Sequence, residues 1–490
     1  METKSLLAET AKKTLWHSLI YGIGTSFTAF VGIVLMPLYT RFLKPEEYGV
    51  YSLISVAFTL LVFIYDFGMI NALFRWVYHY DENEKAARKR VVSTVLFFLL
   101  ALSATLTCIL WNQTANISRI IFKTADFSGL IRLMLIGLFL QSLTWVPFSL
   151  IRINEKPFIF TAIVMLGMVT MVSANFILLS RGKALTGIYE AYIISCAVMA
   201  APLYYITRNE YALAFSFGEL KGMFAFALPF FPVLFFAWVI DFSGRYFLGH
   251  FSTLQQVGLY SAGYKIGQIL YLAEKTFAVA WTPIMLSLSQ RYMERAPDVF
   301  GRVFTYFVFS SFFLVIGVSI FAREIMRIFT TPAYYAATQV VPLIAIAYLL
   351  YGVYVFMLSG LIITKNVYAQ PLILLSAAVI NVMLNILLIP KFGMVGSAYA
   401  TIAGYFIAAA ATFYFSQKFY PIPVEAGRIG KIVITSGLIC YASRFFSIQS
   451  LVVSVFSKAA LLILFFFILY FIRFFTVEET ARLKAFIRRC

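Results

Sequence analysis

Apolar stretches long enough to cross a lipid bilayer recur along the whole of this 490-residue chain. A membrane-spanning helix needs about 20 mostly apolar residues. Hydrophobic residues make up 62% of the sequence and charged residues only 12%, which is far from the balance of soluble domains. The suitable stretches lie near residues 15–40, 48–74, 91–111, 129–151, 157–179, 184–206, 223–244, 257–288, 302–321, 338–363, 367–389, 393–416, 430–446 and 451–475. The sequence therefore predicts an all-α integral membrane protein with about fourteen transmembrane helices.

The distribution of Lys and Arg between the connecting loops predicts how the chain is oriented. The formal net charge is +18, which in a soluble protein would suggest a nucleic-acid partner. With the N-terminus inside, about 24 basic residues fall in inner segments and about 10 in outer ones. The positive-inside rule then predicts a multi-pass cell-membrane protein with both termini in the cytoplasm. Most of the charge excess sets this orientation, so no nucleic-acid partner is expected.

The N-terminal segment and the cysteines exclude two other classes of protein. The first apolar stretch is long and lacks a small-residue cleavage site, so we expect a retained helix, not a signal peptide. The four cysteines lie far apart and the three histidines are isolated from one another. The sequence therefore predicts neither a disulfide framework nor a zinc site.

A short motif that occurs twice predicts an internal duplication. Arg41–Ser52 and Arg245–Ser261 each start with an arginine at the end of an apolar helix and finish with Gly-x-Tyr-Ser at the start of the next one. We interpret spans 1–6 and 7–12 as two pseudo-symmetric six-helix lobes that alternately expose a central cleft to each side of the membrane. The predicted organisation is an N-lobe at 1–206, a cytoplasmic linker at 207–222, a C-lobe at 223–416, two accessory spans at 417–475 and a basic cytoplasmic tail at 476–490.

Span 8 carries charged residues deep in the bilayer, where each needs a specific role. At about 100° per residue, Lys265, Gln268, Tyr271 and Lys275 share one helix face, whereas Glu274 points nearly opposite Lys265. A face of cations and hydrogen-bonding groups suits an anionic substrate that carries hydroxyls. The alternative is that both lysines extend toward the membrane surfaces while Glu274 pairs with a neighbouring helix.

Spans 2 and 7, which the duplication relates to spans 8 and 1, also carry acidic residues. Asp66 lies deep in span 2, and we consider it, with Asp241 and Glu274, as a coupling or charge-pairing group. Asp241 and Arg245 in span 7 are i,i+4 neighbours that can neutralise each other. Pro229 and Pro232 predict a bend in the same span.

Charged residues near the outer ends of the helices admit a simpler interpretation. Arg132, Arg444 and Lys458 lie within about two turns of an outer helix end, so we expect their side chains to extend to the membrane surface. The acidic residues Asp126 and Glu324, in outer loops, have no evident partner in the sequence.

Span 11 has a polar face of a different kind. Asn381 and Asn385 are one helical turn apart, and a tight turn through Pro390 and Gly393 leads into span 12, where Thr401 follows. Such oxygens, with one carboxylate, suit a small hard cation. The alternative is hydrogen bonding between helices, a common use of Asn in membranes.

Two sequence segments resemble the oligosaccharide flippase, or polysaccharide transporter, branch of the multidrug/oligosaccharidyl-lipid/polysaccharide exporter superfamily. One is Pro37-Leu-Tyr-Thr-Arg41-Phe-Leu-Lys-Pro45-Glu-Glu-Tyr48-Gly49-Val-Tyr51, and the other runs from Asn381 through Asn385, Ile389-Pro390 and Gly393 to Gly396-Ser-Ala. The resemblance covers essentially the whole chain. It implies an alternating-access fold with a cationic cavity, and a substrate in which a polyprenyl pyrophosphate carries a short oligosaccharide.

The resemblance also implies a set of functional residues. In the related lipid II flippases a cation site combines an acidic residue on span 7 with polar groups on spans 11 and 12, and Asp241, Asn381, Asn385 and Thr401 stand at comparable positions. Those relatives carry a carboxylate where this chain has Asn385, so Na⁺ coupling is in doubt and H⁺ coupling through Asp241 or Asp66 stays open. No other cofactor is expected. The candidate substrate contacts are Lys265, Lys275, Arg245 and Arg41 for phosphates, Gln268 as a hydrogen-bonding group, and Tyr271, Tyr264 and Trp238 for sugar rings.

Three other functions are weaker interpretations. A cation-coupled drug antiporter of the same superfamily would favour acidic residues in the cleft and has no need of paired lysines on span 8. A glycan polymerase or glycosyltransferase usually needs a large outer region, whereas the outer loops here are short. A structural scaffold would not explain charges kept within the bilayer. We therefore expect a non-enzymatic flippase, monomeric, that meets lipid, its lipid-linked oligosaccharide substrate, and the polymerase and glycosyltransferases of one pathway.

Overall fold

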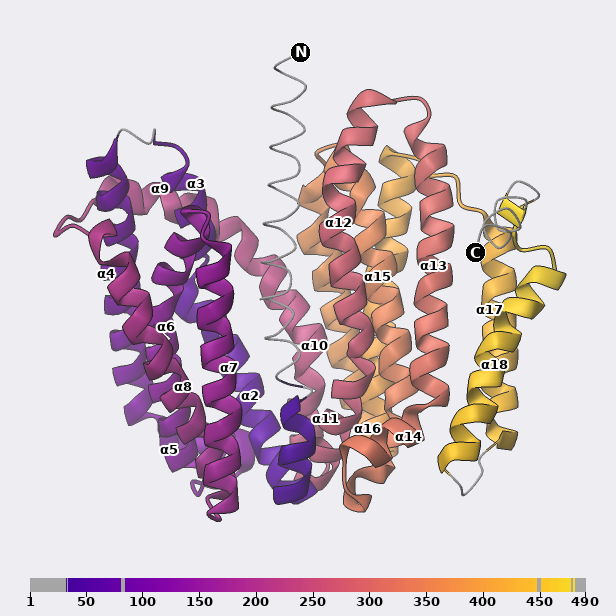
Figure 1. Cartoon of the computed structure of the whole chain (residues 1–490), viewed down its shortest axis with the longest axis horizontal. Helices are drawn as coiled ribbons and strands as arrows, with labels where there is room; N and C mark the ends of the chain where they lie inside the picture. Colours follow the sequence, from indigo (N-terminus) through magenta and orange to yellow (C-terminus); the bar gives the residue numbers. More distant parts are fainter. Residues whose placement is uncertain (1–31, 33, 81–83, 447–450, 477–478, 481–490) are drawn as a thin grey trace. The chain divides into compact units, whose positions relative to one another are not determined.

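The computed structural model describes residues 32, 34–80, 84–446, 451–476 and 479–480, and all regular structure within these ranges is helical (Figure 1). The chain separates into two compact units. Unit 1 comprises Met1–Trp238 and Arg245–Gly258, and unit 2 comprises Val239–Gly244 and Leu259–Cys490. The lobe boundaries expected from the sequence differ from these limits and stay a prediction.

Unit 1 contains the helices of the first half of the chain. They are α2 (Pro45–Asp66), α3 (Met69–Val77), α4 (Lys85–Asn112), α5 (Thr114–Phe122), α6 (Ser128–Ile153), α7 (Pro157–Ser180), α8 (Ala184–Thr207) and α9 (Phe217–Ala227), with the 3-10 turns η1 (Arg208–Glu210) and η2 (Leu228–Phe230). α4, α6, α7 and α8 lie side by side (Figure 1). Two further helices, α10 (Phe231–Phe251) and α11 (Leu254–Gly267), have residues in both units.

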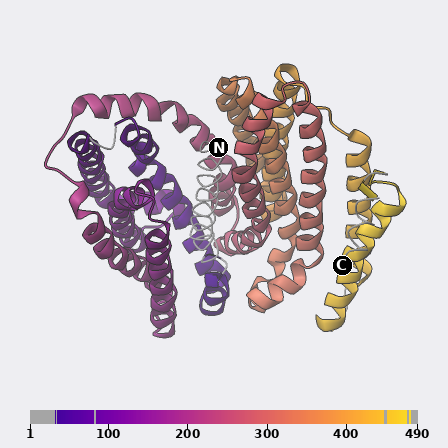
Figure 2. The same ribbon diagram turned by 45° about the horizontal axis from the view of Figure 1, so that its top comes forward.

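Unit 2 contains the remaining helices. They are α12 (Ile269–Arg291), α13 (Ala296–Ile320), α14 (Ala322–Phe329), α15 (Val341–Ile363), α16 (Gln370–Phe419), α17 (Ala426–Ala442) and α18 (Leu451–Phe471), with the 3-10 segments η3 (Pro332–Gln339), η4 (Val367–Ala369) and η5 (Ser443–Phe446). α15 packs along α16, and α17 and α18 lie side by side in both views (Figures 1 and 2).

The described residues contain 12 helical stretches long and apolar enough to cross a membrane, as the sequence predicts for a multi-pass protein. One of them, Val367–Phe419, has 53 residues and is far too long for a single crossing. Gly393 divides it, because its φ of 53° and ψ of −131° interrupt the helix at the predicted turn between spans 11 and 12. Most of the predicted span at 15–40 lies outside the described residues, so the count of fourteen stays a prediction.

The start of α2 shows how one repeated motif produces local structure. Pro45 occupies the first turn, where its missing N–H leaves no bond unmade, and the carboxylate of Glu47 accepts a hydrogen bond of 2.8 Å from the Lys44 N–H. One turn later, the backbone of Gly49 lies directly against the backbone of α11. A Cβ on Gly49 would lie 2.0 Å from the Leu254 carbonyl oxygen, and a Cβ on Gly258 would lie 1.9 Å from that of Pro45. The glycines of the two motif copies therefore lie face to face within unit 1.

The predicted bend in span 7 is present. α9 ends at Ala227 and α10 begins at Phe231, with Pro229 in the 3-10 turn η2 between them. Figure 1 shows α9 lying across the ends of α3 and α4 and α10 running down from it. Pro229 and Pro232 remove backbone donors at this point, so the helix cannot continue straight.

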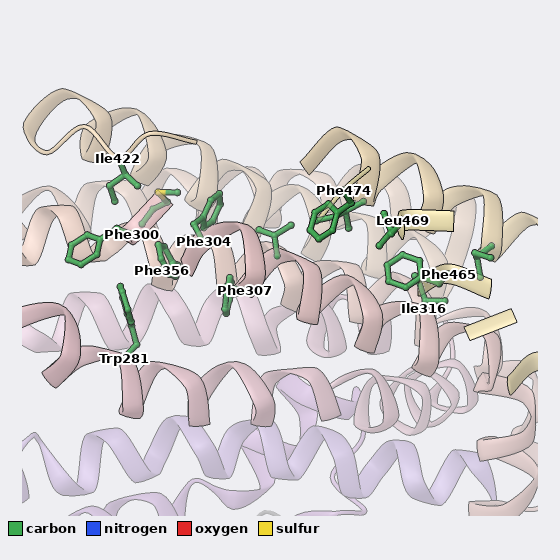
Figure 3. Close-up of a cluster of buried hydrophobic side chains, with 14 of the residues drawn as sticks. Trp281, Phe300, Phe304, Phe307, Ile316, Phe356, Ile422, Phe465, Leu469 and Phe474 are labelled. Atoms are coloured by element: carbon green, nitrogen blue, oxygen red, sulfur yellow. The ribbon is translucent and has the colours of Figure 1, made fainter. Parts of the chain in front are cut away.

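Unit 2 is held together by an aromatic core, which Figure 3 shows between α12, α13, α15 and α18. The ring of Trp281 stacks on that of Phe356 with centroids 5.3 Å apart and meets Phe300 edge to face at 5.2 Å. Phe465 and Phe474, from and just after α18, extend the same cluster. The accessory helices are thus part of one continuous core with α13.

A buried ion pair between α14 and α18 corrects two sequence-based expectations. Lys458 is 5% exposed and Glu324 is 3% exposed, and the Lys458 Nζ lies 2.7 Å from Glu324 Oε1. The hydroxyl of Ser454 donates to the same carboxylate oxygen at 2.6 Å. Lys458 therefore does not extend to the membrane surface, and Glu324 does have a partner. The sequence could not pair them because more than a hundred residues separate them.

Candidate functional site: a carboxylate in a tyrosine cage

Three tyrosine hydroxyls surround the carboxylate of Asp241 in unit 2. Tyr264 on α11, Tyr348 on α15 and Tyr405 on α16 each donate a hydrogen bond to Asp241 Oδ1, at 3.0, 3.3 and 2.5 Å. All three tyrosines are at most 2% exposed. We call Asp241 and these three residues the tyrosine cage. The cage joins four helices through one oxygen atom and supplies the hydrogen bonds that a carboxylate needs in an apolar environment.

Sequence reasoning found Asp241 and Tyr264 but missed Tyr348 and Tyr405. Tyr348 and Tyr405 lie in strongly apolar spans, where a tyrosine resembles any other large core residue. The available signal was chemical, because a buried tyrosine hydroxyl needs a partner and a buried carboxylate needs donors. Tyr264 was predicted to face sugar rings, but its hydroxyl and its 1% exposure place it inside the cage.

Beside the cage, the two amides of span 11 bind each other. Asn385 Nδ2 donates to the backbone oxygen of Asn381 at 2.9 Å and to Asn381 Oδ1 at 3.0 Å. The Ser243 hydroxyl donates to the same Asn381 Oδ1 at 3.1 Å. These contacts fix both amide orientations, because turning Asn385 over would bring its oxygen against two acceptors. The predicted placement of both amides on one face is therefore observed, and both are fully buried.

Two polar atoms next to these amides are buried against α10. Asn385 Oδ1 and Ser397 Oγ have no hydrogen-bond partner among the described residues. Both face Gly244 of α10, where a Cβ would lie 2.3 Å from Ser397 Oγ and 3.3 Å from Asn385 Oδ1. Thr401 donates to the Ser397 carbonyl oxygen at 3.0 Å, and its hydroxyl lies 3.4 Å from that of Tyr260. Gly244 thus allows α10 to pack closely against these oxygens, because a side chain there would collide with Ser397 Oγ.

As they stand in this structure, several of the polar atoms expected to bind Na⁺ already hold hydrogen bonds, and the Na⁺ site stays a prediction. Three tyrosine donors engage one carboxylate oxygen of Asp241, and two donors occupy both lone pairs of Asn381 Oδ1. Asn385 Oδ1 and Ser397 Oγ accept no hydrogen bond from the described residues.

Of the residues predicted to form a cationic face on span 8, the structure brings two together, and the shared face stays a prediction. The ammonium group of Lys275 is exposed and lies 6.0 Å from the centre of the Tyr271 ring, so these two residues share one face of α12. Lys265 and Gln268 are half-buried on α11 and just after it. Glu274 points the other way and is 3% exposed, with the Ser311 hydroxyl donating to its Oε1 at 2.9 Å. Lys275 and Glu274 are thus neighbours in sequence that face opposite surroundings.

The other predicted residues lie in unit 1. Arg41 is exposed and Arg245 is 8% exposed. The Trp238 indole donates to Thr59 Oγ1 at 3.2 Å. Asp66 accepts a 3.1 Å hydrogen bond from the Ile70 N–H and so caps α3, where Phe67 and Gly68 break the helix at positive φ. Within the described ranges no three His, Cys, Asp or Glu residues cluster as a metal site.

The structure and comparisons with known proteins define the class of this protein. It is a multi-pass, helical membrane protein with a transporter fold. It resembles the lipid II flippase MurJ in an inward closed conformation, with a TM-score of 0.74 and 15% identity over 92% of this chain and 99% of that chain. It also resembles an inward-facing multidrug resistance MATE family transporter of the MOP superfamily, with a TM-score of 0.66 and 16% identity over 83% and 96% of the two chains.

The family is shown by sequence. A family model described as polysaccharide biosynthesis protein matches residues 38–338, which is more than half of the chain. The chain therefore belongs to this family. One relative is named the probable low-salt glycan biosynthesis flippase Agl15 of Haloferax volcanii, which is 26% identical over 193 residues. That alignment covers 39% of this chain and 40% of the relative, so the chain matches less than half of the relative's length.

Proposed function

We propose that this protein is a flippase that moves polyprenyl-pyrophosphate-linked oligosaccharides from the cytoplasmic to the outer leaflet for the synthesis of a surface polysaccharide. The family match and the glycan flippase among its relatives support this proposal. The observation that carries it is the exposed ammonium group of Lys275 in a membrane-spanning helix, beside the Tyr271 ring. A cation kept exposed at that depth needs an anionic partner, and pyrophosphate is such a group.

We also propose that the protein acts by alternating access, in the cell membrane, with both termini in the cytoplasm. The excess of Lys and Arg in alternate loops supports this orientation. The substrate would come from glycosyltransferases on the inner side and pass to a polymerase on the outer side. Arg41, Arg245, Lys265, Gln268, Tyr271 and Trp238 remain proposed substrate contacts.

Removing both span 8 lysines tests the proposed function. The double variant Lys265→Gln/Lys275→Gln is expected to lower the flipping rate about tenfold or more, because two charge-assisted contacts to phosphate are lost. The measurement is flipping of a defined polyprenyl-pyrophosphate oligosaccharide in liposomes. The matched control, Lys156→Gln/Lys365→Gln, removes two exposed lysines that lie between candidate membrane spans and should leave the rate unchanged. Normal flipping by the span 8 variant at an unchanged melting temperature would contradict the proposed role of the two lysines, and no flipping by wild type would contradict the proposed function.

The same liposomes distinguish a second candidate function. Likeness to the MATE transporter and the buried carboxyl groups of Asp241 and Glu274 favour a cation-coupled antiporter. An antiporter would move organic cations against a Na⁺ or H⁺ gradient and leave the lipid-linked sugar in its leaflet. A flippase would move the lipid-linked sugar and ignore the organic cation.

We propose that Na⁺ does not couple transport at the tyrosine cage, which leaves H⁺ or no coupling ion. Replacing Asn385 with aspartate should create sodium dependence, because it restores a carboxylate that faces two oxygens of Asn381. Wild type should melt at the same temperature in NaCl and KCl. In KCl, N385D should be less stable than wild type. Its free energy of unfolding should rise by about 1.4 kcal/mol when Na⁺ is present at about ten times its Kd. Asn112→Asp, an exposed change of the same kind, should show no difference between the salts, and sodium stabilisation of wild type would refute the proposal.

A further inference from the structure

The connection between η1 and α9 in unit 1 exposes three large apolar side chains. Its two ends, Tyr211 and Ser216, have extended backbone, and in an extended chain successive side chains point to opposite sides. Leu213 is completely exposed, Phe217 is 79% exposed and Phe215 is 42% exposed. The rings of Phe215 and Phe217 meet edge to face, with centroids 4.9 Å apart. We call these three side chains, spaced by two residues, the apolar edge.

Hydrogen bonds to α4 hold the apolar edge outward. The Ala212 N–H donates to Ser93 Oγ at 2.8 Å, and the Ser216 N–H donates to Thr94 Oγ1 at 3.0 Å. Both hydroxyl-bearing side chains are fully buried. A shift of one residue would turn the three apolar side chains toward α4, so these two bonds fix which side of the segment faces the surroundings.

The apolar edge lies at the level where the membrane boundary is expected for unit 1. The first six residues of α4 include four basic ones and end at Arg90, whereas no residue from Val91 to Asn112 is charged. Ser93 lies only two residues, or about 3 Å, beyond this change. Figures 1 and 2 both show the connection from α8 to α9 at the edge of unit 1, on the side away from α2. The exposed side chains are therefore placed to meet lipid.

Basic side chains accompany the apolar edge. Lys89 and Arg90 stand one turn before the two hydroxyl-bearing residues of α4 and so on the same side of that helix. Lys221 is exposed on α9, one turn after the last residue of the edge. The single acidic residue of α9, Glu219, accepts a hydrogen bond from the Tyr80 hydroxyl. Apolar side chains flanked by lysine and arginine are typical of segments that bind the surface of an anionic membrane.

We propose that the apolar edge is a docking site for anionic phospholipids of the bilayer surface. Its three side chains insert at the boundary between headgroups and acyl chains, while Lys89, Arg90 and Lys221 bind the lipid phosphates. This anchors the connection between α8 and α9, and with it the start of the bent span 7, to the membrane surface. The site concerns membrane lipid and is independent of which substrate the protein moves.

Fluorescence quenching in nanodiscs of phosphatidylcholine and phosphatidylglycerol tests the depth of the edge. The fluorophore NBD is attached to Leu213→Cys in full-length protein whose four native cysteines are replaced by alanine. A nitroxide on the lipid acyl chain should quench this NBD. Iodide in the water should quench it several-fold less than NBD on the control Ala86→Cys, because Ala86 is exposed on α4 about 10 Å nearer the helix start than Ser93.

The same label tests the preference for anionic lipid. The nitroxide should quench NBD at residue 213 about twofold more when phosphatidylglycerol carries it than when phosphatidylcholine does, because basic residues enrich the anionic lipid around the edge. Lys89→Gln/Lys221→Gln should make the two lipids quench equally. The control Lys123→Gln/Arg181→Gln removes two exposed charges at the other end of unit 1 and should keep the preference.

A further variant removes the apolar contribution and keeps the charges. Phe215→Ser/Phe217→Ser should increase iodide quenching at residue 213, since the remaining edge is too small to hold the segment in lipid. Three results would overturn the proposal: iodide quenching at residue 213 as strong as at residue 86, equal quenching by the two nitroxide lipids in the otherwise unchanged protein, or an undiminished lipid preference in Lys89→Gln/Lys221→Gln. Unchanged iodide quenching in Phe215→Ser/Phe217→Ser would overturn it as well.

Discussion

Lys458→Met is expected to lower the free energy of unfolding by about 3–5 kcal/mol, because it leaves the Glu324 carboxylate buried without its counter-charge. The pair connects α14 to α18, and both side chains are almost completely enclosed. Burial by itself raises the pKa of Glu324, but the hydrogen bonds from Lys458 and Ser454 outweigh it and hold the pKa below its usual value. The stabilisation from this pair is therefore present at neutral pH and is lost as the pH falls through that lowered pKa.

A double-mutant cycle separates the pair from its surroundings. Lys458→Met/Glu324→Gln should recover much of the loss, because neither side chain then carries an unpaired charge. Ser454→Ala removes only one hydrogen bond to the carboxylate and should cost about 1–3 kcal/mol. Melting of the purified variants in detergent is the measurement. Equal stability of Lys458→Met and wild type would show that the two side chains do not meet in the folded protein.

Gly258→Ala is expected to destabilise the protein by about 1–3 kcal/mol, because its Cβ would lie 1.9 Å from the Pro45 carbonyl oxygen. The obstacle is backbone, which cannot turn aside as a side chain can, so α2 and α11 would have to separate. Gly49→Ala should behave alike, since its Cβ would meet the Leu254 carbonyl oxygen at 2.0 Å.

A matched glycine tests this explanation in the same melting experiment. Gly437 of α17 is exposed, and a Cβ there meets nothing within 4 Å. Gly437→Ala should therefore be neutral or stabilise by up to about 1 kcal/mol, as in any open helix. If Gly258→Ala and Gly437→Ala melted alike, close contact between the two helices would be refuted.

The motif glycines show how a sequence signal can be found before its cause is known. The repeat of Gly-x-Tyr-Ser indicated a duplication, but nothing in the amino-acid sequence indicated that the glycines of the two copies are in contact. Gly49 and Gly258 are far apart in the chain, and only the packing of α2 on α11 brings each to the other's backbone. The same limit applies to Tyr348 and Tyr405, which were indistinguishable from core residues until the fold placed them on Asp241.

The sequence could predict which face of a helix a residue occupies, but not which residues of other helices it contacts. The 3.6-residue period placed Tyr271 with Lys275 and put Glu274 on the other side, and the structure shows this separation. The period did not reveal that Glu274 packs against Gly352 of α15, or that Lys458 is buried against Glu324. The expectation for Lys458 was wrong because it considered only how close the residue lies to the end of its helix. It could not include α14, whose Glu324 covers the lysine side chain.

The sequence by itself determined that the chain is a multi-pass helical membrane protein, that span 7 bends at its prolines and that spans 11 and 12 are divided at Gly393. These properties depend on segment length, apolar content and backbone chemistry, which act within about 20 consecutive residues. The tertiary structure alone decided which partners the buried carboxyl groups have. Asp241 accepts hydrogen bonds from three tyrosines, and Glu324 pairs with Lys458. Glu274 accepts one hydrogen bond from a hydroxyl, and its second oxygen has no partner among the described residues. Hydrogen bonds and ion pairs act over a few ångströms between distant segments, and only the folded chain sets those distances.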